Sequence, residues 1–152
     1  MDAKSISPFL EAVATVMPQL GFAKVERGRL SLNKTNKIEN LGVMVVVGLT
    51  HQIRGNIAYN MTVDAAKGVA SKMMMGMPVE TFDAMAESAI AELGNMLTAN
   101  AATIFEKQGS KVDISPPTVI TGTAHASTAS AQSLAVEVKI DGIPLVINVS
   151  VT

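Results

Sequence analysis

The sequence predicts an α+β fold in which a largely antiparallel sheet is covered on one face by long helices. The expected elements follow the order α, β, β, β, α, α, β, β, β, which is not the strand–helix alternation of a doubly wound parallel sheet. Two turn signals, Arg54-Gly55-Asn56 and Asp141-Gly142, each separate two strand-like runs, so each marks an antiparallel hairpin. The 152 residues, 48% of them hydrophobic, suit a single domain that spans residues 1–152.

Three segments have the pattern of helices. In the first, Ser7 is a plausible N-cap and Pro8 stands at the first helical position, where its missing N–H costs little. A glycine near the end of each pattern, at Gly21, Gly76 and Gly109, marks the expected helix end. The expected helices are Ile6–Leu20, Asp64–Met75 and Phe82–Lys107.

Six segments rich in β-branched or alternating residues are expected to be strands. They are Lys24–Leu32, Leu41–Leu49, Ile57–Met61, Val119–His125, Leu134–Ile140 and Pro144–Val151. Each half of the chain is then a helix followed by strands that finish in a hairpin. The spacing Ser-x3-Glu occurs in both halves, as Ser7 with Glu11 and as Ser88 with Glu92. This pattern predicts a pseudo-two-fold internal repeat, although Ser and Glu are common in helices and chance also explains the shared spacing.

Composition excludes several classes of function. Twelve Lys and Arg residues against 13 Asp and Glu give a net charge of −1, which lacks the basic footprint of a nucleic-acid-binding protein. The chain has no Cys, so disulfides, thiolate catalysis and cysteine metal sites are absent. The N-terminal segment carries Asp2 and Glu11 and contains Pro8 and Pro18, which favours an amphipathic helix over a signal peptide. With no long apolar run, we expect a cytoplasmic protein that does not contact membranes.

The segment Phe82–Lys107 carries the strongest functional signal. At about 100° per residue, its apolar side chains fall within one arc, with Met85 and Met96 at the edge of that arc. On the far side, Ser88, Glu92 and Asn95 form a separate line at i, i+4 and i+7. Their neighbours on that side are Ala84, Ala91, Ala99 and Ala102. Small residues around two polar groups favour a docking face for another molecule; the alternative is a face buried in the same chain, where Glu92 would need a partner.

The two polar side chains suggest phosphoryl transfer. An amide does not titrate, so Asn95 cannot be a general base, but it can hold a water molecule in line with a phosphorus atom. Glu92 can pair with a cation on a partner. The pair makes chemical sense if the partner brings the phosphoryl group, a metal ion and a lysine.

These residues carry a family resemblance. Segment 86–96 (AESAIAELGNM) resembles the signature Asp/Ser-x3-Glu-x2-Asn of the CheC/CheX/FliY chemotaxis phosphatases, and it is most similar to the CheX members. Segment 111–120 (KVDISPPTVI) is also similar to the CheX segment that follows the active helix. The order of elements agrees over nearly the whole chain.

The resemblance implies a protein phosphatase acting on the phospho-aspartate of a CheY-type response regulator. It implies that Asn95 orients the attacking water, that Glu92 pairs with a lysine of the regulator, and that Ser88 supports them. It implies no cofactor of the chain's own, Mg²⁺ on the regulator, and a homodimer. Ala14 stands where the first half would need an amide, so we expect one active site per chain.

Two other functions stay open at this point. One is a non-catalytic module of the same fold that binds a response regulator, such as a flagellar-switch adaptor; a scaffold would not need the amide of Asn95. The other is a small-ligand sensor built on the sheet, although no cluster of polar residues indicates its cavity. His51 and His125 stand in separate strand-like segments and are a poor metal site. The methionines of segment 73–77 are expected to fill core gaps, with a plastic binding surface as the alternative.

Overall fold

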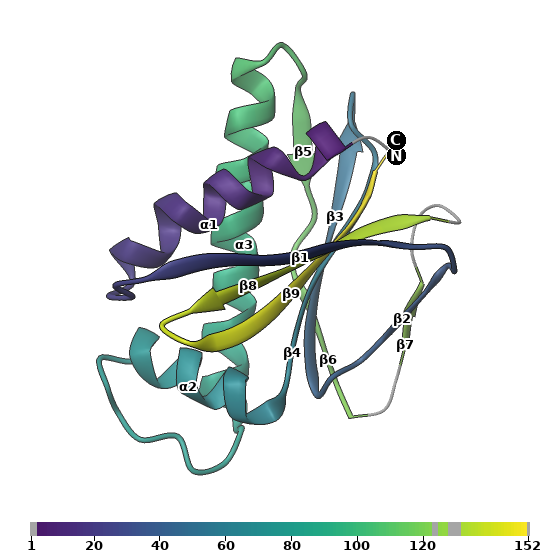
Figure 1. Cartoon of the computed structure of the whole chain (residues 1–152). Helices are drawn as coiled ribbons and strands as arrows, with labels where there is room; N and C mark the ends of the chain where they lie inside the picture. Colours follow the sequence, from purple (N-terminus) through teal and green to yellow (C-terminus); the bar gives the residue numbers. More distant parts are fainter. Residues whose placement is uncertain (1–2, 123–124, 128–131, 152) are drawn as a thin grey trace.

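The computed structural model describes residues 3–122, 125–127 and 132–151. A short 3₁₀ helix, η1 (Ala3–Ser5), leads into α1 (Ser7–Gln19), and two further helices, α2 (Val63–Met73) and α3 (Ala84–Lys107), lie in the middle of the chain. In Figure 1, α1 and α3 cross on one side of the strands, and α2 lies near the first turns of α3. The strands are β1 (Val25–Asn33), β2 (Lys37–Glu39), β3 (Val43–His51), β4 (Gly55–Met61), β5 (Val112–Ile114), β6 (Thr118–Thr121), β7 (His125–Ser127), β8 (Ser133–Ile140) and β9 (Ile143–Val151).

The strand pairings confirm the predicted fold class. The larger sheet has the order β1-β8-β9-β4-β3-β5, and β6 also pairs with β3. Every pairing among the described strands is antiparallel, and both predicted hairpins are present as β3–β4 and β8–β9. A second, two-stranded sheet joins β2 to β7.

Several local predictions were wrong. The expected strand Val119–His125 is two elements, β6 and β7, that belong to different sheets. Strands β2 and β5 were missed because runs of three residues are too short to show a periodic pattern. The N-cap of α1 is Ile6, in a helical conformation without a side-chain cap, because η1 continues directly into the helix.

The sheet order supports the predicted pseudo-two-fold repeat. The two hairpins meet at the centre of the larger sheet, where β4 pairs with β9. Outside them, β1 from the first half pairs with β8 of the second hairpin, while β5 and β6 from the second half pair with β3 of the first. Each half therefore contributes its early strand to the hairpin of the other half.

Equivalent hydrogen bonds join loop to turn at both ends of the sheet. In the β8–β9 turn, Asp141 donates its backbone N–H to the carbonyl of Lys24, and its carboxylate accepts from the Lys24 N–H at 2.7 Å. In the β3–β4 turn, Gln52 donates its N–H to the carbonyl of Lys111, and its side-chain oxygen accepts from the Lys111 N–H. The same pair of hydrogen bonds is thus made by an aspartate in one half and by a glutamine in the other.

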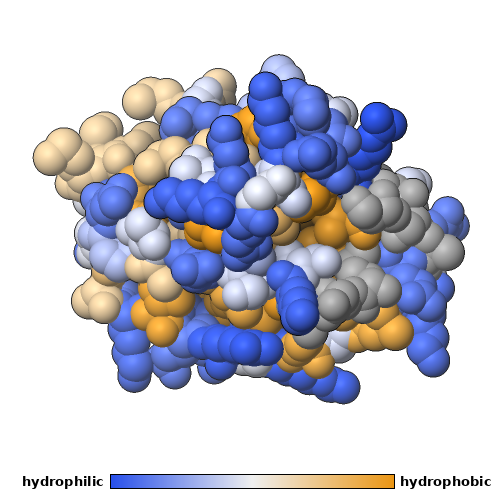
Figure 2. Space-filling model, turned by 90° about the horizontal axis from the view of Figure 1, so that it is seen from above, coloured by the Kyte–Doolittle hydropathy of each residue, from blue (hydrophilic) through white to orange (hydrophobic). Residues whose placement is uncertain are grey.

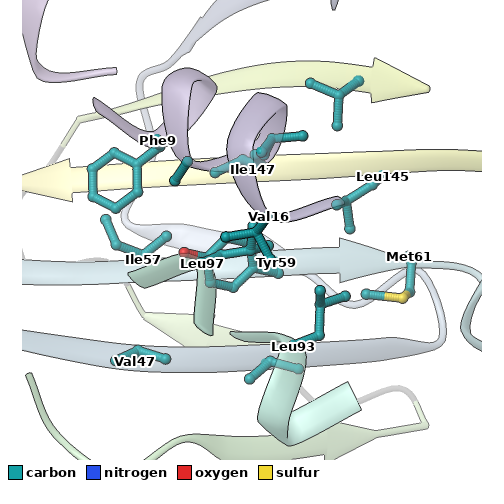
Figure 3. Close-up of a cluster of buried hydrophobic side chains, with 14 of the residues drawn as sticks. Phe9, Val16, Val47, Ile57, Tyr59, Met61, Leu93, Leu97, Leu145 and Ile147 are labelled. Atoms are coloured by element: carbon teal, nitrogen blue, oxygen red, sulfur yellow. The ribbon is translucent and has the colours of Figure 1, made fainter. Parts of the chain in front are cut away.

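One apolar core lies between the helices and the sheet face they cover. Figure 3 shows Phe9 and Val16 of α1 and Leu93 and Leu97 of α3 above side chains of β3, β4 and β9, with Tyr59 among them. Phe9 and Phe105 meet edge to face, with ring centroids 5.8 Å apart, and join α1 to α3. On the other face of the sheet, Ile38 of β2 and Ala126 of β7 cover Met44 and Ala58. Strands β2 and β7 therefore close a second, smaller cluster.

The surface mixes polar and apolar side chains. Figure 2 shows this for the face seen from above, where hydrophilic side chains stand between smaller hydrophobic areas. Among the described residues, no helix is long and apolar enough to cross a membrane.

Candidate functional site

The site is built on the first half of α3. Asp83 fixes the start of this helix because its carboxylate accepts the backbone N–H of Ala86 at 2.9 Å. The helix then continues for 24 residues without an internal proline. Residues spaced by three or four positions therefore lie above one another on a rigid surface.

The structure places the three predicted site residues on one exposed face of α3. Ser88 and Glu92 are exposed, and Asn95 is half-buried. In the part of the chain that the structure describes, the side chains of Glu92 and Asn95 form no hydrogen bond or ion pair. The alternative of a carboxylate buried in the same chain is thereby excluded, and both groups are free to bind another molecule.

Gly94, between Glu92 and Asn95, allows the helix to pack closely against the sheet. A Cβ atom at this position would lie 2.6 Å from Cγ1 of Val45 in β3, which is closer than real Cβ contacts. Because glycine has no Cβ, α3 approaches β3 more closely here than any other residue would allow. The neighbouring Asn95 is therefore held at a fixed height above the sheet.

Behind the same turn, a buried hydrogen-bonded chain links the sheet to the helix. Thr98 donates its hydroxyl to the carbonyl of Gly94 at 2.7 Å, and the Thr98 oxygen lies 2.7 Å from the hydroxyl of Tyr59 in β4. Since the Thr98 proton is already used, Tyr59 donates. Burial raises the pKa of Tyr59 above its ordinary value, so this phenol stays protonated. Sequence reasoning missed this pair because nothing in the pattern joins two distant polar residues.

A shallow groove runs beside the site. Its lining residues are Ala84, Glu87, Ser88 and Ala91 of α3 together with Pro117 and Val119 from the segment that enters β6, and its volume is about 310 Å³. The small side chains of α3 leave this space open, as the docking-face prediction requires. The two segments that carry the family resemblance, around Glu92 and around Pro117, thus lie next to each other.

The equivalent face of α1 lacks the amide. When Ser7 is aligned with Ser88, five buried positions of α1 coincide with five buried positions of α3. The coinciding pairs are Phe9 with Ile90, Ala12 with Leu93, Val13 with Gly94, Val16 with Leu97 and Met17 with Thr98. Ser7, Glu11 and Ala14 are exposed, in the places of Ser88, Glu92 and Asn95.

The methionines divide into two groups. Met73 and Met74 pack against the core as predicted, but Met75 is 96% exposed and Met77 is 57% exposed. Met85, expected at the edge of the core stripe, is 62% exposed, because no described element covers the first turn of α3 on that side. The prediction that the methionines of segment 73–77 fill core gaps is therefore wrong for Met75 and Met77.

The two histidines lie in different sheets. His51 ends β3, and His125 begins β7 in the other sheet. Among the described residues, no three His, Asp or Glu side chains converge as metal ligands would.

Sequence comparison shows relatives of known activity. Residues 43–141 match the family model described as chemotaxis phosphatase CheX. A CheY-P phosphatase CheX of Thermotoga maritima is 36% identical over 123 residues, which cover 80% of this chain and 78% of the relative.

Solved structures share the fold. The chemotaxis protein CheX of Desulfovibrio desulfuricans superposes with a TM-score of 0.84 at 22% identity, covering 95% of this chain and 97% of the other. A CheX–CheY–BeF3–Mg²⁺ complex from Borrelia burgdorferi contains a chain that superposes with a TM-score of 0.75 at 26% identity, covering 96% of each chain. The Thermotoga maritima FliY structure matches with a TM-score of 0.74 at 20% identity, covering 99% of this chain and 91% of that one.

Proposed function

The chain belongs to the chemotaxis phosphatase CheX family, and on this premise we propose that it hydrolyses the phospho-aspartate of a CheY-type response regulator. The observation that carries the proposal is the exposed Glu92 next to the half-buried Asn95, beside an open groove; neither side chain has a polar partner among the described residues. A substrate that is itself a folded protein needs such a shallow site, since its acyl phosphate reaches the enzyme only at the regulator's own surface. The related phosphatase of Thermotoga maritima, named for its action on CheY-P, supports the same substrate.

In the proposed reaction, a water oxygen attacks the phosphorus atom in line with the bond to the aspartate oxygen. That P–O bond breaks, the regulator recovers its carboxylate, and inorganic phosphate leaves. The Asn95 amide accepts a hydrogen bond from the water and fixes its direction of approach, which is the positioning that phosphoryl transfer requires. Mg²⁺ held by the regulator supplies charge stabilisation at the phosphoryl oxygens; that this chain holds no metal of its own stays a prediction.

Glu92 has a different role in this proposal. Its carboxylate stands one turn before Asn95 on the same face and pairs with a lysine of the regulator. This pairing orients the regulator and draws its lysine away from the phosphoryl group. Ser88, one turn earlier, lines the groove and supports the contact without touching the reacting atoms.

The proposal is tested by the lifetime of a regulator labelled on its phospho-aspartate, measured with and without the full chain. The expected result is faster release of inorganic phosphate in proportion to the amount of chain added. A chain that binds the regulator and leaves this lifetime unchanged would be an adaptor. The amide of Asn95, half-buried and without a polar partner among the described residues, favours the enzyme over the adaptor.

The predicted homodimer and cytoplasmic location belong to the same proposal. Strand β1 lies at one end of the larger sheet, and no described strand pairs with its outer side, so a second copy can extend the sheet there. Sedimentation at micromolar concentration is expected to show a dimer, and a monomer alone would contradict it. The location fits a substrate that is a signalling protein of the cell interior.

A further inference from the structure

The loop between α2 and α3 and the first turn of α3 present exposed apolar side chains, the methionine patch, formed by Met75 and Met77 of the loop and Met85 of α3. These side chains are 96%, 57% and 62% exposed. Met77 and Met85 line one hollow of about 450 Å³, together with Pro78, Val79 and neighbouring residues of the loop. In Figure 1 this loop is the long segment below α2 that leads into α3.

The patch continues the face that carries the proposed active site. Met85, Ser88, Glu92 and Asn95 follow one another at intervals of three, four and three residues, so they form one line along α3. Met85 lies about 10 Å from Glu92 along the helix axis. A protein–protein interface of ordinary size covers about 800 Å² on each partner, which corresponds to a disc of roughly 16 Å radius. A regulator centred on Glu92 and Asn95 therefore reaches Met85 and the hollow beside it.

Met75 stands at a backbone position that normally holds glycine. The three helices α1, α2 and α3 end with the same pattern of hydrogen bonds, in which the second residue after the cap donates to a carbonyl of the last helical turn. In α1 and α3 the residue before that donor is Gly21 or Gly109, with φ of 95° and 97°. In α2 it is Met75, with φ of 61°.

This choice of residue is unfavourable for the folded chain alone. A side chain at positive φ is strained, and Met75 gains nothing in return because almost all of it is exposed. The loop is nevertheless well fixed, since Gly76 N–H donates to the carbonyl of Ser71 at 2.8 Å and the Ser71 hydroxyl donates to the carbonyl of Met77 at 2.7 Å. A rigid loop thus holds a long apolar side chain in solvent, which is typical of a contact surface.

We propose that the methionine patch is a second contact surface for the phosphorylated regulator, beside the catalytic face; this rests on the proposed function. Methionine is flexible and polarisable, so it can fit an apolar side chain of the partner. Glu80 and Asp83 line the same hollow, which predicts that the partner carries basic groups next to that apolar side chain. The patch sets affinity, while Asn95 sets the rate of hydrolysis.

The test uses two variants and one matched control in the full chain. Met75→Gly gives α2 the residue found at the ends of α1 and α3, and Met85→Gln keeps length and helix propensity while removing the apolar tip. Leu32→Gln alters an exposed apolar residue, 45% exposed, on β1 at the opposite end of the sheet from β5 and β6. Because a second copy is proposed to pair with β1, sedimentation first establishes that this variant assembles like the wild type. Affinity is measured for a CheY-type regulator activated with Mg²⁺ and beryllofluoride, which involves no hydrolysis.

We expect both patch variants to bind the activated regulator about fivefold more weakly. Leu32→Gln is expected to bind like wild type. Met75→Gly should also raise the midpoint of thermal unfolding by about 2–4 °C, which separates loss of binding from loss of structure.

Wild-type affinity in both patch variants would overturn the inference. So would a change of sedimentation coefficient in either variant, because the patch would then lie between copies of the chain. Failure of the wild type to release phosphate would contradict the proposed function alone.

Discussion

Helices α1 and α3 occupy equivalent places in the two halves of the chain, and three of the differences between their equivalent residues bear on the proposed chemistry. Where α3 has Asn95, α1 has Ala14, so the first half lacks the amide. The second and third differences lie on the buried face, where α3 has Gly94 and Thr98, and α1 has Val13 and Met17.

The difference indicates that the repeat supplies a scaffold, and the proposed chemistry depends on a few departures from it. Val13 and Met17 are buried in the apolar core, and α1 packs chiefly against α3. Gly94 allows α3 to touch β3 directly, and Thr98 ties it to Tyr59 of β4. The amide of Asn95 is therefore placed on the helix that is held more rigidly against the sheet.

A large effect on turnover, which sharpens the comparison of the two helices, is expected for Gly94→Ala. The new Cβ would clash with Val45, lift α3 and displace Asn95, so turnover at saturating regulator should fall about tenfold to a hundredfold. Overpacking should also lower the free energy of unfolding by about 1–3 kcal/mol. Gly68→Ala in α2 is the matched control, because its Cβ would meet only the end of the Ile143 side chain at 3.3 Å. Equal turnover in the two variants would show that the close approach of α3 is unimportant.

A smaller effect is expected for Glu92→Ala, which removes the carboxylate that we propose pairs with the regulator's lysine. Affinity for the activated regulator should fall about tenfold, since a charged hydrogen bond of this kind is worth about 1.5–3 kcal/mol. Titration of the regulator at equilibrium measures the change. Unaltered affinity would remove Glu92 from the binding surface.

Lowering the pH should weaken the hydrogen bonds between Asp141 and Lys24 but not the equivalent hydrogen bonds between Gln52 and Lys111. Backbone N–H donors of Lys24 and Ala23 lower the pKa of Asp141, so the charged carboxylate stabilises the folded chain. This contribution is complete above the unfolded pKa of 3.8 and is lost as the pH falls below it towards the folded pKa. We expect Asp141→Asn to have a lower unfolding midpoint than wild type near neutral pH, with the two converging at low pH. Gln52, which makes the equivalent hydrogen bonds with Lys111, carries no charge. The difference in unfolding midpoint between Gln52→Ala and the wild type should therefore not disappear at low pH.

No effect on catalysis is expected for Glu11→Ala, the counterpart of Glu92→Ala on α1. Glu11 is exposed and has the same spacing from Ser7 as Glu92 has from Ser88, but no amide follows it. Affinity and turnover should both equal those of wild type in a dephosphorylation time course. A loss comparable to that of Glu92→Ala would mean that both halves engage the regulator.

The sequence was sufficient for the fold class, the two hairpins and the exposed line of Ser88, Glu92 and Asn95, because each produces a periodic or local signal. Spacing along one helix determines which side chains share a face, whatever the rest of the fold does. The family signature then supplied roles that spacing alone does not give. The roles of Glu92 and Asn95 remain predictions.

The features that could not be predicted depend on contacts between distant parts of the chain. The approach of Gly94 to Val45 and the hydrogen bond from Tyr59 to Thr98 join residues about 40 to 50 positions apart. Met85 is likewise exposed because no described element packs over the first turn of α3 on that side. Its position at the edge of the apolar arc was correctly placed, but periodicity cannot tell a covered edge from an open one.

The central claim, that α3 alone carries the hydrolytic step through Asn95, is tested most directly by turnover of the Asn95→Ala chain at saturating phosphorylated regulator. Removing the group that orients the water should lower this rate about a hundredfold or more, with affinity nearly unchanged. Asn95→Asp keeps the shape but places negative charge beside the phosphoryl group, so it should do no better than alanine. Full turnover of Asn95→Ala at saturation would contradict the account.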